Sequence, residues 1–197
     1  PNKLYKNTGD FKFKDITVDS KTEDYTGFST GVTMLDINND GWLDIYVSKA
    51  GSLNDDNGRR NLLFVNQKNG TFVEEAKKWR IDDPGYSTQA YSLDYDKDGD
   101  LDIYVSSEEA ENGKANALFE NLGDGTFIKP LPNGFNGDTL ISFANAIGDF
   151  NLDGKMDIVV VNALGDPMSI WENQTNNSNN WLKVKLELIL HHFKNHS

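Results

Sequence analysis

The sequence predicts an all-β protein, a β-propeller-like array of four-stranded blades with three complete repeats and a partial blade at each end. An acidic nine-residue loop recurs three times, at steps of 58 and 55 residues, and β-branched and aromatic residues follow each copy. A second motif, a hairpin flanked by Asn residues, alternates with these loops. Self-similarity at about 40–55 residues, with roughly four strands per unit, is typical of propeller blades.

The chain opens on the first copy of the hairpin motif. It reads Asn-x-Leu-aromatic-x-Asn, then a polar turn containing Gly and a further aromatic residue, a pattern that predicts two antiparallel strands. The copies begin at Asn2, Asn61 and Asn116. Their closing aromatic residues are aligned as Phe11, Phe72 and Phe127, and a degraded fourth copy spans 169–173. We expect residues 2–17 to form the second half of a blade whose first half is missing.

The acidic loops contain the candidate metal ligands of the chain. In the copy from Asp94 to Asp102, acidic residues stand at positions 1, 3, 5 and 9, and Gly99 stands at position 6. Carboxylates two residues apart turn toward one point only if the backbone coils tightly, and Gly permits the angles that this coil needs. Such a shell suits Ca2+, which takes six to eight oxygen ligands at about 2.3–2.6 Å. The residue at position 7 would add its backbone carbonyl.

Each loop supplies five candidate ligands, with Asn replacing Asp at position 3 of the first and third loops. The candidates are Asp36, Asn38, Asp40, Trp42 and Asp44; Asp94, Asp96, Asp98, Asp100 and Asp102; and Asp149, Asn151, Asp153, Lys155 and Asp157. Trp42, Asp100 and Lys155 are the residues at position 7. We expect about three Ca2+ per chain, which would offset half of the formal net charge of -12.

Two alternatives compete with this interpretation. An EF-hand begins with the same pattern, but it needs a bidentate Glu at position 12 and a helix on each side. Position 12 here is Val47, Val105 and Val160, within strand-like sequence, so the EF-hand is excluded. The second alternative is an acidic turn without a metal, in which carboxylates crowded into nine residues would repel each other without a counter-ion.

Each acidic loop is predicted to join two antiparallel strands, for example 90–93 with 103–106. The polar connections at 50–60 and 108–114 are expected to be exposed, and 76–80 to form a helical turn before a tight turn at 82–85. Repeats are assigned to 2–173. Residues 174–187 are predicted to be a linker followed by a strand at 181–186, and 188–197 fit no repeat.

Composition narrows the possible functions. The net charge argues against nucleic acid as a partner, and no hydrophobic run approaches the roughly 20 residues of a membrane span. The absence of Cys excludes thiolate chemistry, and no nucleophile or metalloprotease motif occurs. His191, His192 and His196 lie in the patternless tail. We therefore expect a non-catalytic protein, located where calcium is abundant: extracellular, at the cell surface or periplasmic.

The loop and hairpin together resemble the FG-GAP or VCBS-type repeat. The resemblance covers 2–173 and implies a calcium-binding propeller like those of integrin α-subunits and bacterial surface proteins. The strand at 180–186 further resembles the opening of the ASPIC/UnbV domain that often follows such repeats.

We therefore expect a calcium-stabilised binding or adhesion module with a protein or glycan ligand, for which Trp42 is the best candidate contact. The alternatives are an accessory or substrate-binding part of a secreted carbohydrate- or lipid-processing enzyme, and a structural subunit that docks on partner chains in a larger assembly.

Overall fold

The structure, a computed structural model, describes residues 2–51, 56–108, 116–130, 135, 138 and 140–176. The strand expected at 181–186 and the tail lie outside these residues.

The N-terminal hairpin pairs β1 (Tyr5–Gly9) with β2 (Lys12–Asp15). The first blade holds β3 (Phe28–Leu35), β4 (Asp44–Ala50), β5 (Leu62–Asn66) and β6 (Phe72–Glu74). The second blade holds β7 (Ser87–Leu93), β8 (Asp102–Ser107), β9 (Ala117–Asn121) and β10 (Phe127–Ile128). The third blade holds β11 (Ser142–Gly148), β12 (Asp157–Asn162) and β13 (Ser169–Trp171).

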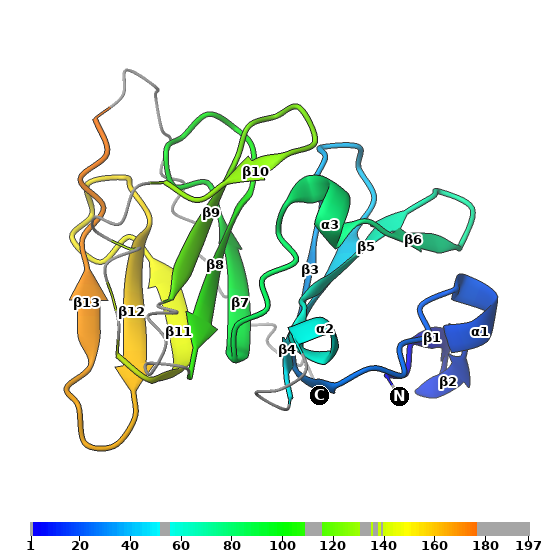
Figure 1. The fold of residues 1–197 in the computed structure, drawn as a ribbon. Helices are drawn as coiled ribbons and strands as arrows, with labels where there is room; N and C mark the ends of the chain where they lie inside the picture. The colour runs from blue at the N-terminus through cyan, green and yellow to red at the C-terminus, as the bar shows by residue number, and fades with distance from the viewer. Residues whose placement is uncertain are drawn as a thin grey trace, which may run out of the picture.

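The all-β, propeller-like architecture is confirmed. Strands within each blade are antiparallel and follow the order of the chain, and the inner strand β7 lies between the inner strands β3 and β11 (Figure 1). The pairing predicted across the acidic loop is also confirmed, since Ala90 lies opposite Val105 and Leu93 opposite Asp102. The third blade shows three strands within the described residues, which end at residue 176.

Each inner strand carries a β-bulge at the same repeat position. The bulged residues are Thr30, Thr88 and Phe143. The Thr30 hydroxyl donates to the Ser87 carbonyl at 2.6 Å, and the Thr88 hydroxyl donates to the Ser142 carbonyl at 3.0 Å. A bulge frees one residue from the strand ladder and re-aims its side chain, so here it links one blade to the next.

The hydrophobic core lies between the blades. One buried cluster joins residues of the first blade, such as Tyr46 and Leu63, to residues of the second, such as Ile103 and Phe119. A second cluster repeats this arrangement between the second and third blades, with Tyr104 facing Ile158. No blade could bury both faces alone, so neighbouring blades stabilise each other.

The N-terminal hairpin corrects the predicted alignment of the closing aromatic residues. Asn7 lies opposite Phe13, as Asn66 lies opposite Phe72 and Asn121 opposite Phe127. Phe13 is therefore the equivalent residue, and Phe11 lies on the turn, 96% exposed and with a φ of 55°. The sequence alignment was wrong because the Gly of this turn comes two residues earlier relative to the flanking Asn.

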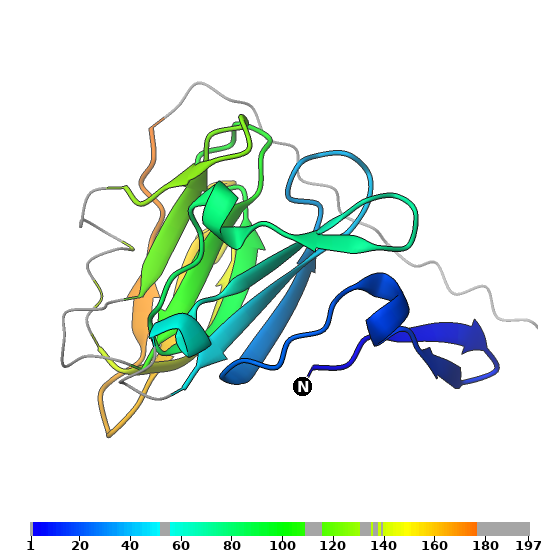
Figure 2. The ribbon, with the colours of Figure 1, turned by 45° about the vertical axis from the view of Figure 1, so that its right-hand side comes forward.

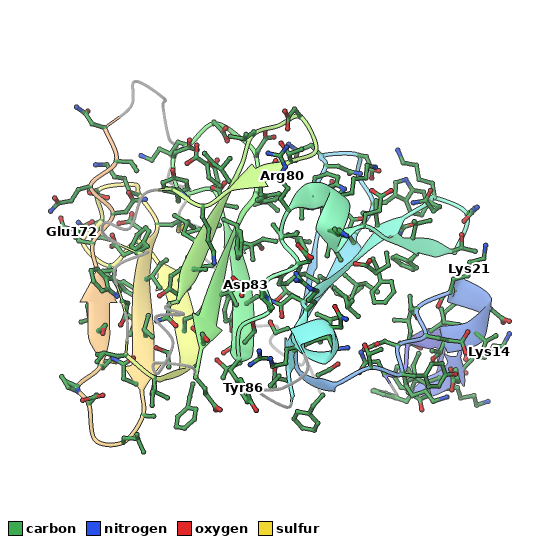
Figure 3. The ribbon with its side chains drawn as sticks, viewed as in Figure 1. Lys14, Lys21, Arg80, Asp83, Tyr86 and Glu172 are labelled. Atoms are coloured by element: carbon green, nitrogen blue, oxygen red, sulfur yellow. The ribbon has the colours of Figure 1, made fainter. Side chains whose placement is uncertain are left out.

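Within the described residues, three short helices lie in the connections between strands. They are α1 (Thr17–Ser20), α2 (Asp56–Arg59) and α3 (Ala76–Trp79). The helical turn expected at 76–80 is confirmed, and Lys21 and Arg80, labelled in Figure 3, end α1 and α3 in the same left-handed conformation. α1 is thus the counterpart of α3, one repeat earlier. In the part of the chain that the structure describes, no helix has the length and apolar character needed to cross a membrane.

Within the described residues of the connection at 50–60, Arg59 departs from the expected exposure, whereas Asn57 is exposed as expected. Arg59, within α2, is only 2% exposed, and its guanidinium lies over the ring of Tyr86 at 5.5 Å from the ring centroid. Lys49, at the end of β4 and just before this connection, is fully buried as well. The polar sequence around Arg59 predicts exposure, whereas packing against the neighbouring segments buries the cation.

Candidate metal centre

The three acidic loops lie at the same end of the blades, each between an inner strand and the strand that follows it (Figure 1). They are the first loop (36–44), the second loop (94–102) and the third loop (149–157). The first and second loops touch, because the Asn39 amide donates to Asp100 Oδ1 at 2.6 Å and to the Gly99 carbonyl at 3.2 Å. The candidate ligands are therefore gathered on one rim of the array.

The residue at position 1 folds each loop. In the second loop, Asp94 accepts hydrogen bonds from the backbone N–H groups of Asp98 at 3.1 Å and Gly99 at 3.2 Å. Asp36 and Asp149 accept the equivalent pairs in the other two loops. The glycine at position 6 has a φ of 85°, 97° and 84° in the three loops, which a side chain would oppose. The tight coil expected from the sequence is formed in all three loops.

The residue at position 9 is the first residue of the next strand, and its carboxylate closes each loop. Asp102 accepts from the N–H of Tyr95 at 2.9 Å and from the N–H of Asn121 at 2.8 Å. Asp44 and Asp157 make the same two kinds of contact. All three are buried, with exposures of 0%, 1% and 2% along the chain. Each oxygen of these carboxylates retains capacity for a further partner.

The second loop brings three of its candidate ligands together. Oxygen atoms of Asp94, Asp96 and Asp102 all lie within 4.8 Å of one another. Asp98 is not part of this group, because it is exposed and its Oδ1 accepts from the N–H of Asp100 at 2.9 Å. An oxygen cluster of this kind has the donor chemistry that Ca2+ prefers. The residues present therefore fit a hard cation.

The first and third loops repeat this frame with an amide at position 3. Asn38 and Asn151 accept from the N–H at position 5, at 3.2 and 3.0 Å. Asp40 and Asp153 accept from the N–H at position 7, as Asp98 does. Trp42 and Lys155 occupy position 7, and the Trp42 side chain is 49% exposed. Asp40 also pairs with Lys68 at 3.3 Å.

Burial, with a smaller contribution from neighbouring carboxylates, raises the pKa values of candidate ligands in the first two loops. Burial, reinforced by the neighbouring Asp96 and Asp98, raises the pKa of Asp102 to about 8, despite its two backbone hydrogen bonds. Burial and the charge of Asp98 likewise raise the pKa of Asp96. In the first loop, burial raises the pKa of Asp44. A cation among these groups would favour their ionised forms.

The Asn residues that end the hairpin motif belong to the site, although sequence reasoning gave them only a hairpin role. The Asn121 amide donates to the carbonyl of Ile37, at position 2 of the first loop, at 3.1 Å. The Asn173 amide donates to the carbonyl of Tyr95, at position 2 of the second loop, at 2.7 Å. Each Asn therefore ties its own blade to the acidic loop of the preceding blade. Their recurrence at the repeat period was the available signal.

Comparisons with known proteins agree with this architecture. The chain matches the FG-GAP-like repeat over residues 1–47, 51–105 and 107–160, so each matched segment begins in the outer half of one blade and ends in the inner half of the next. It is also 25% identical to cartilage acidic protein 1 of Xenopus tropicalis and of Homo sapiens, over 93% of this chain. The chain spans 29% and 28% of the length of these two relatives. With three consecutive matches that cover most of its length, the chain belongs to the family of FG-GAP-like repeat proteins.

Proposed function

We propose that this chain is a calcium-stabilised, non-catalytic binding module that acts outside the cytoplasm. The observation that carries the proposal is the convergence of Asp94, Asp96 and Asp102 in a loop whose backbone geometry recurs twice more. Ca2+ would take oxygens from positions 1, 3 and 9, with the carbonyl at position 7 as a further donor. We expect about three ions per chain, one for each loop.

Calcium would stabilise each blade by holding its two hairpins together. Each loop joins the inner strand to the next strand, and its position-9 carboxylate already holds the outer hairpin through one backbone N–H. An ion bound there would fix both hairpins of a blade at one point. A ligand that binds only the folded state stabilises it by about 4 kcal/mol at a thousandfold excess over Kd.

An extracellular location fits both this chemistry and the relatives. Loops of this kind are useful where calcium is abundant, and the matched relatives are named for cartilage. A role in binding is favoured over catalysis because the carboxylates of the loops would be held by the metal and unavailable for proton transfer. The half-exposed Trp42 offers an aromatic surface beside the first loop for a protein or glycan ligand.

The test is the calcium stoichiometry of the purified chain, measured by equilibrium dialysis, together with thermal unfolding before and after calcium removal. Three variants sharpen it. Asp94→Asn removes the position-1 carboxylate and should leave about two ions, whereas Asp96→Asn should keep about three, because the first and third loops carry Asn at that position naturally. Asp124→Asn, in a Gly turn outside the loops, is the matched control and should also keep three. The absence of bound calcium in the parent chain would overturn the proposal.

A further inference from the structure

Two buried asparagines connect the three acidic loops through hydrogen bonds. The Asn173 amide donates to the carbonyl of Tyr95 in the second loop at 2.7 Å. The Asn121 amide donates to the carbonyl of Ile37 in the first loop at 3.1 Å. The backbone N–H of each Asn donates to the position-9 carboxylate of its own blade, so each Asn contacts two acidic loops. Figure 2 shows the first and second loops at the same, upper end of their blades.

The residue at position 2 continues the connection through each loop. Tyr95 accepts at its carbonyl from Asn173, and its own N–H donates to the position-9 carboxylate of Asp102 at 2.9 Å. Ile37 makes the same pair of bonds in the first loop, with an N–H bond of 3.1 Å to its position-9 carboxylate. The position-9 carboxylates of the three loops are therefore joined in one series of hydrogen bonds.

The members of this series are shielded from water. Asn121 and Asn173 are 4% and 2% exposed, and the position-9 carboxylates are buried as well. Away from water a hydrogen bond is electrostatically stronger, and bonds in a series polarise one another. Leaving a polar group unpaired is also costly there. A change in the geometry of one loop therefore affects the loop that is bonded to it.

The second loop lies in the middle of the series and has the most negative charge. It contains five Asp residues, at positions 1, 3, 5, 7 and 9, whereas the first and third loops contain three each. The third loop also has a cation, Lys155, at position 7. Because the affinity of a calcium loop depends on the charge of its ligands, the second loop should have the highest affinity of the three.

The first and second loops are also in direct contact. The Asn39 amide, at position 4 of the first loop, donates to Asp100 Oδ1 at 2.6 Å and to the Gly99 carbonyl at 3.2 Å. Asp100 is the position-7 residue whose backbone carbonyl is a candidate ligand. The backbone that would hold an ion in the second loop is therefore bonded to the first loop at a second point.

We propose that the three loops bind calcium as one coupled unit, in which occupancy of the second loop raises the affinity of the other two. Asn121 and Asn173 are the positioning residues that couple them. This coupling rests on the proposed calcium function, and it adds an order of filling and a dependence between sites that three independent sites would not show.

Order in one loop favours order in the next. Tyr95 lies between the candidate ligands Asp94 and Asp96, so calcium in the second loop would restrict its backbone. The Tyr95 carbonyl would then be a fixed acceptor for Asn173, whose N–H serves the position-9 carboxylate of the third loop. A loop that is already ordered loses less conformational entropy on binding, which raises its affinity. The effect is reciprocal, because two coupled sites share one coupling free energy.

Asn66 is the matched residue without this link. Its amide donates to the carbonyl of Leu43, at position 8 of its own loop, at 3.1 Å. The Asn121 amide makes the equivalent contact with Leu101 at 3.2 Å, in addition to its link with Ile37. Asn66→Ala therefore removes the contact within the blade alone, whereas Asn121→Ala removes the link between loops as well.

The experiment measures calcium binding to each loop separately. Hydrogen exchange detected by mass spectrometry follows the peptides that contain residues 36–44, 94–102 and 149–157 at a series of free calcium concentrations. The concentration that gives half of the full protection is the midpoint of that loop. Asp94→Asn removes the position-1 carboxylate of the second loop and so disables the site in the middle of the series.

We expect Asp94→Asn to raise the midpoints of both the first and the third loop by about fivefold or more, as is typical of coupled sites. Asp124→Asn is the matched control, because it makes the same change in a Gly turn outside the loops. It should leave the midpoints of all three loops unchanged.

The asparagine variants test which residues couple the loops. In an Asn121→Ala background, Asp94→Asn should shift the first loop much less, because only the Asn39 contact remains, and should still shift the third loop. In an Asn173→Ala background the third loop should respond much less and the first loop as before. Asn66→Ala should leave both responses intact.

The outcomes separate this coupling from the calcium function on which it rests. Midpoints that Asp94→Asn does not move would overturn the coupling alone, whereas a parent chain without calcium-dependent protection would overturn both. Equal responses of the first and third loops in every background would contradict the role of the two asparagines. If Asp94→Asn does not fold, Asp98→Lys, at an exposed position of the same loop, takes its place, and Asn→Ser replaces Asn→Ala where needed, with the same outcomes.

Discussion

The carboxylate of Asp102 accepts a hydrogen bond of 2.8 Å from the backbone N–H of Asn121, and so joins the acidic loop of the second blade to its outer hairpin. Asp44 with Asn66 and Asp157 with Asn173 repeat the contact at 2.7 and 2.8 Å. The last residue of each loop therefore holds the blade together as well as being a candidate ligand. Removing calcium and removing this carboxylate should have separable effects.

Asp102→Asn should destabilise the chain even without calcium. The amide retains one acceptor oxygen but turns an NH2 group, which cannot accept, toward one of the two N–H donors. Both oxygens of the Asp102 carboxyl group can accept a hydrogen bond, whether the group is protonated or ionised. Leaving a buried donor unsatisfied costs about 1–3 kcal/mol. Urea unfolding of the calcium-free protein measures the loss. Asp98→Asn, at an exposed position that accepts one hydrogen bond, is the control and should change the unfolding free energy little. Equal effects would show that the two backbone contacts contribute nothing.

The calcium-free protein should lose stability as the pH rises from 5 to 8. Burial raises the pKa of Asp102 to about 8 in the folded state, against an ordinary value of 3.8. The folded state therefore holds a proton that the unfolded state releases, so stability from this group is greatest below pH 4 and is lost as the pH rises toward 8. Saturating calcium should remove this slope, because the ion favours the ionised carboxylate.

Asp102→Asn is the control for the pH dependence, since an amide does not titrate. Urea unfolding of parent and variant at a series of pH values gives the difference in slope directly. A parent chain whose calcium-free stability rises between pH 5 and pH 8, relative to the variant, would contradict the raised pKa. An unchanged slope in saturating calcium would argue against Asp102 as a ligand.

The features of this protein that could be predicted from sequence are those that depend on residues close together within one repeat. Loop positions, the pairing of inner strands and the helical turn at 76–80 all follow from residue types at fixed short spacings. Contacts between distant residues could not be read in this way. The burial of Lys49 and the link from Asn121 to Ile37 depend on which segments meet in space, and the polar character of these residues carries no sign of that. The alignment of Phe11 with the closing aromatic residues was wrong because the Gly of its turn is displaced relative to the strands.

The Asn residues at the ends of the hairpin motif should contribute unequally to stability. Asn121→Ala removes a link to the preceding blade, because its amide donates to the Ile37 carbonyl. Asn66→Ala is the matched change in the first blade, where the amide reaches only Leu43 of the same blade. We expect about 1–2 kcal/mol for Asn121→Ala and less for Asn66→Ala, since Asn66 is only half-buried. Thermal or urea unfolding measures the loss of stability in each variant. A larger loss for Asn66→Ala than for Asn121→Ala would contradict the linking role of Asn121.

The buried ion pair of Lys49 and Asp24 should matter far more than its surface counterpart. The Lys49 ammonium is fully buried and donates to Asp24 at 2.5 Å and to the Thr26 hydroxyl at 2.8 Å. Asp24→Asn leaves this cation without its counter-charge, which costs about 3–5 kcal/mol. Asp19→Asn breaks an exposed pair with Lys14 and should cost less than about 1 kcal/mol. Urea unfolding of both variants beside the parent measures the two losses, and similar values would show that burial adds nothing to the Lys49 pair.

The same pair should make stability depend on pH at the acid end. Burial of Asp24 raises its pKa, but the hydrogen bonds from Lys49 and Thr26 outweigh burial, and its pKa lies below the ordinary value of 3.8. Its contribution is therefore present above pH 4 and is lost as the pH falls through the lowered pKa. Urea unfolding between pH 2 and pH 6 should show a steeper loss for the parent than for Asp24→Asn. Parallel curves would mean that the carboxylate is not held by Lys49.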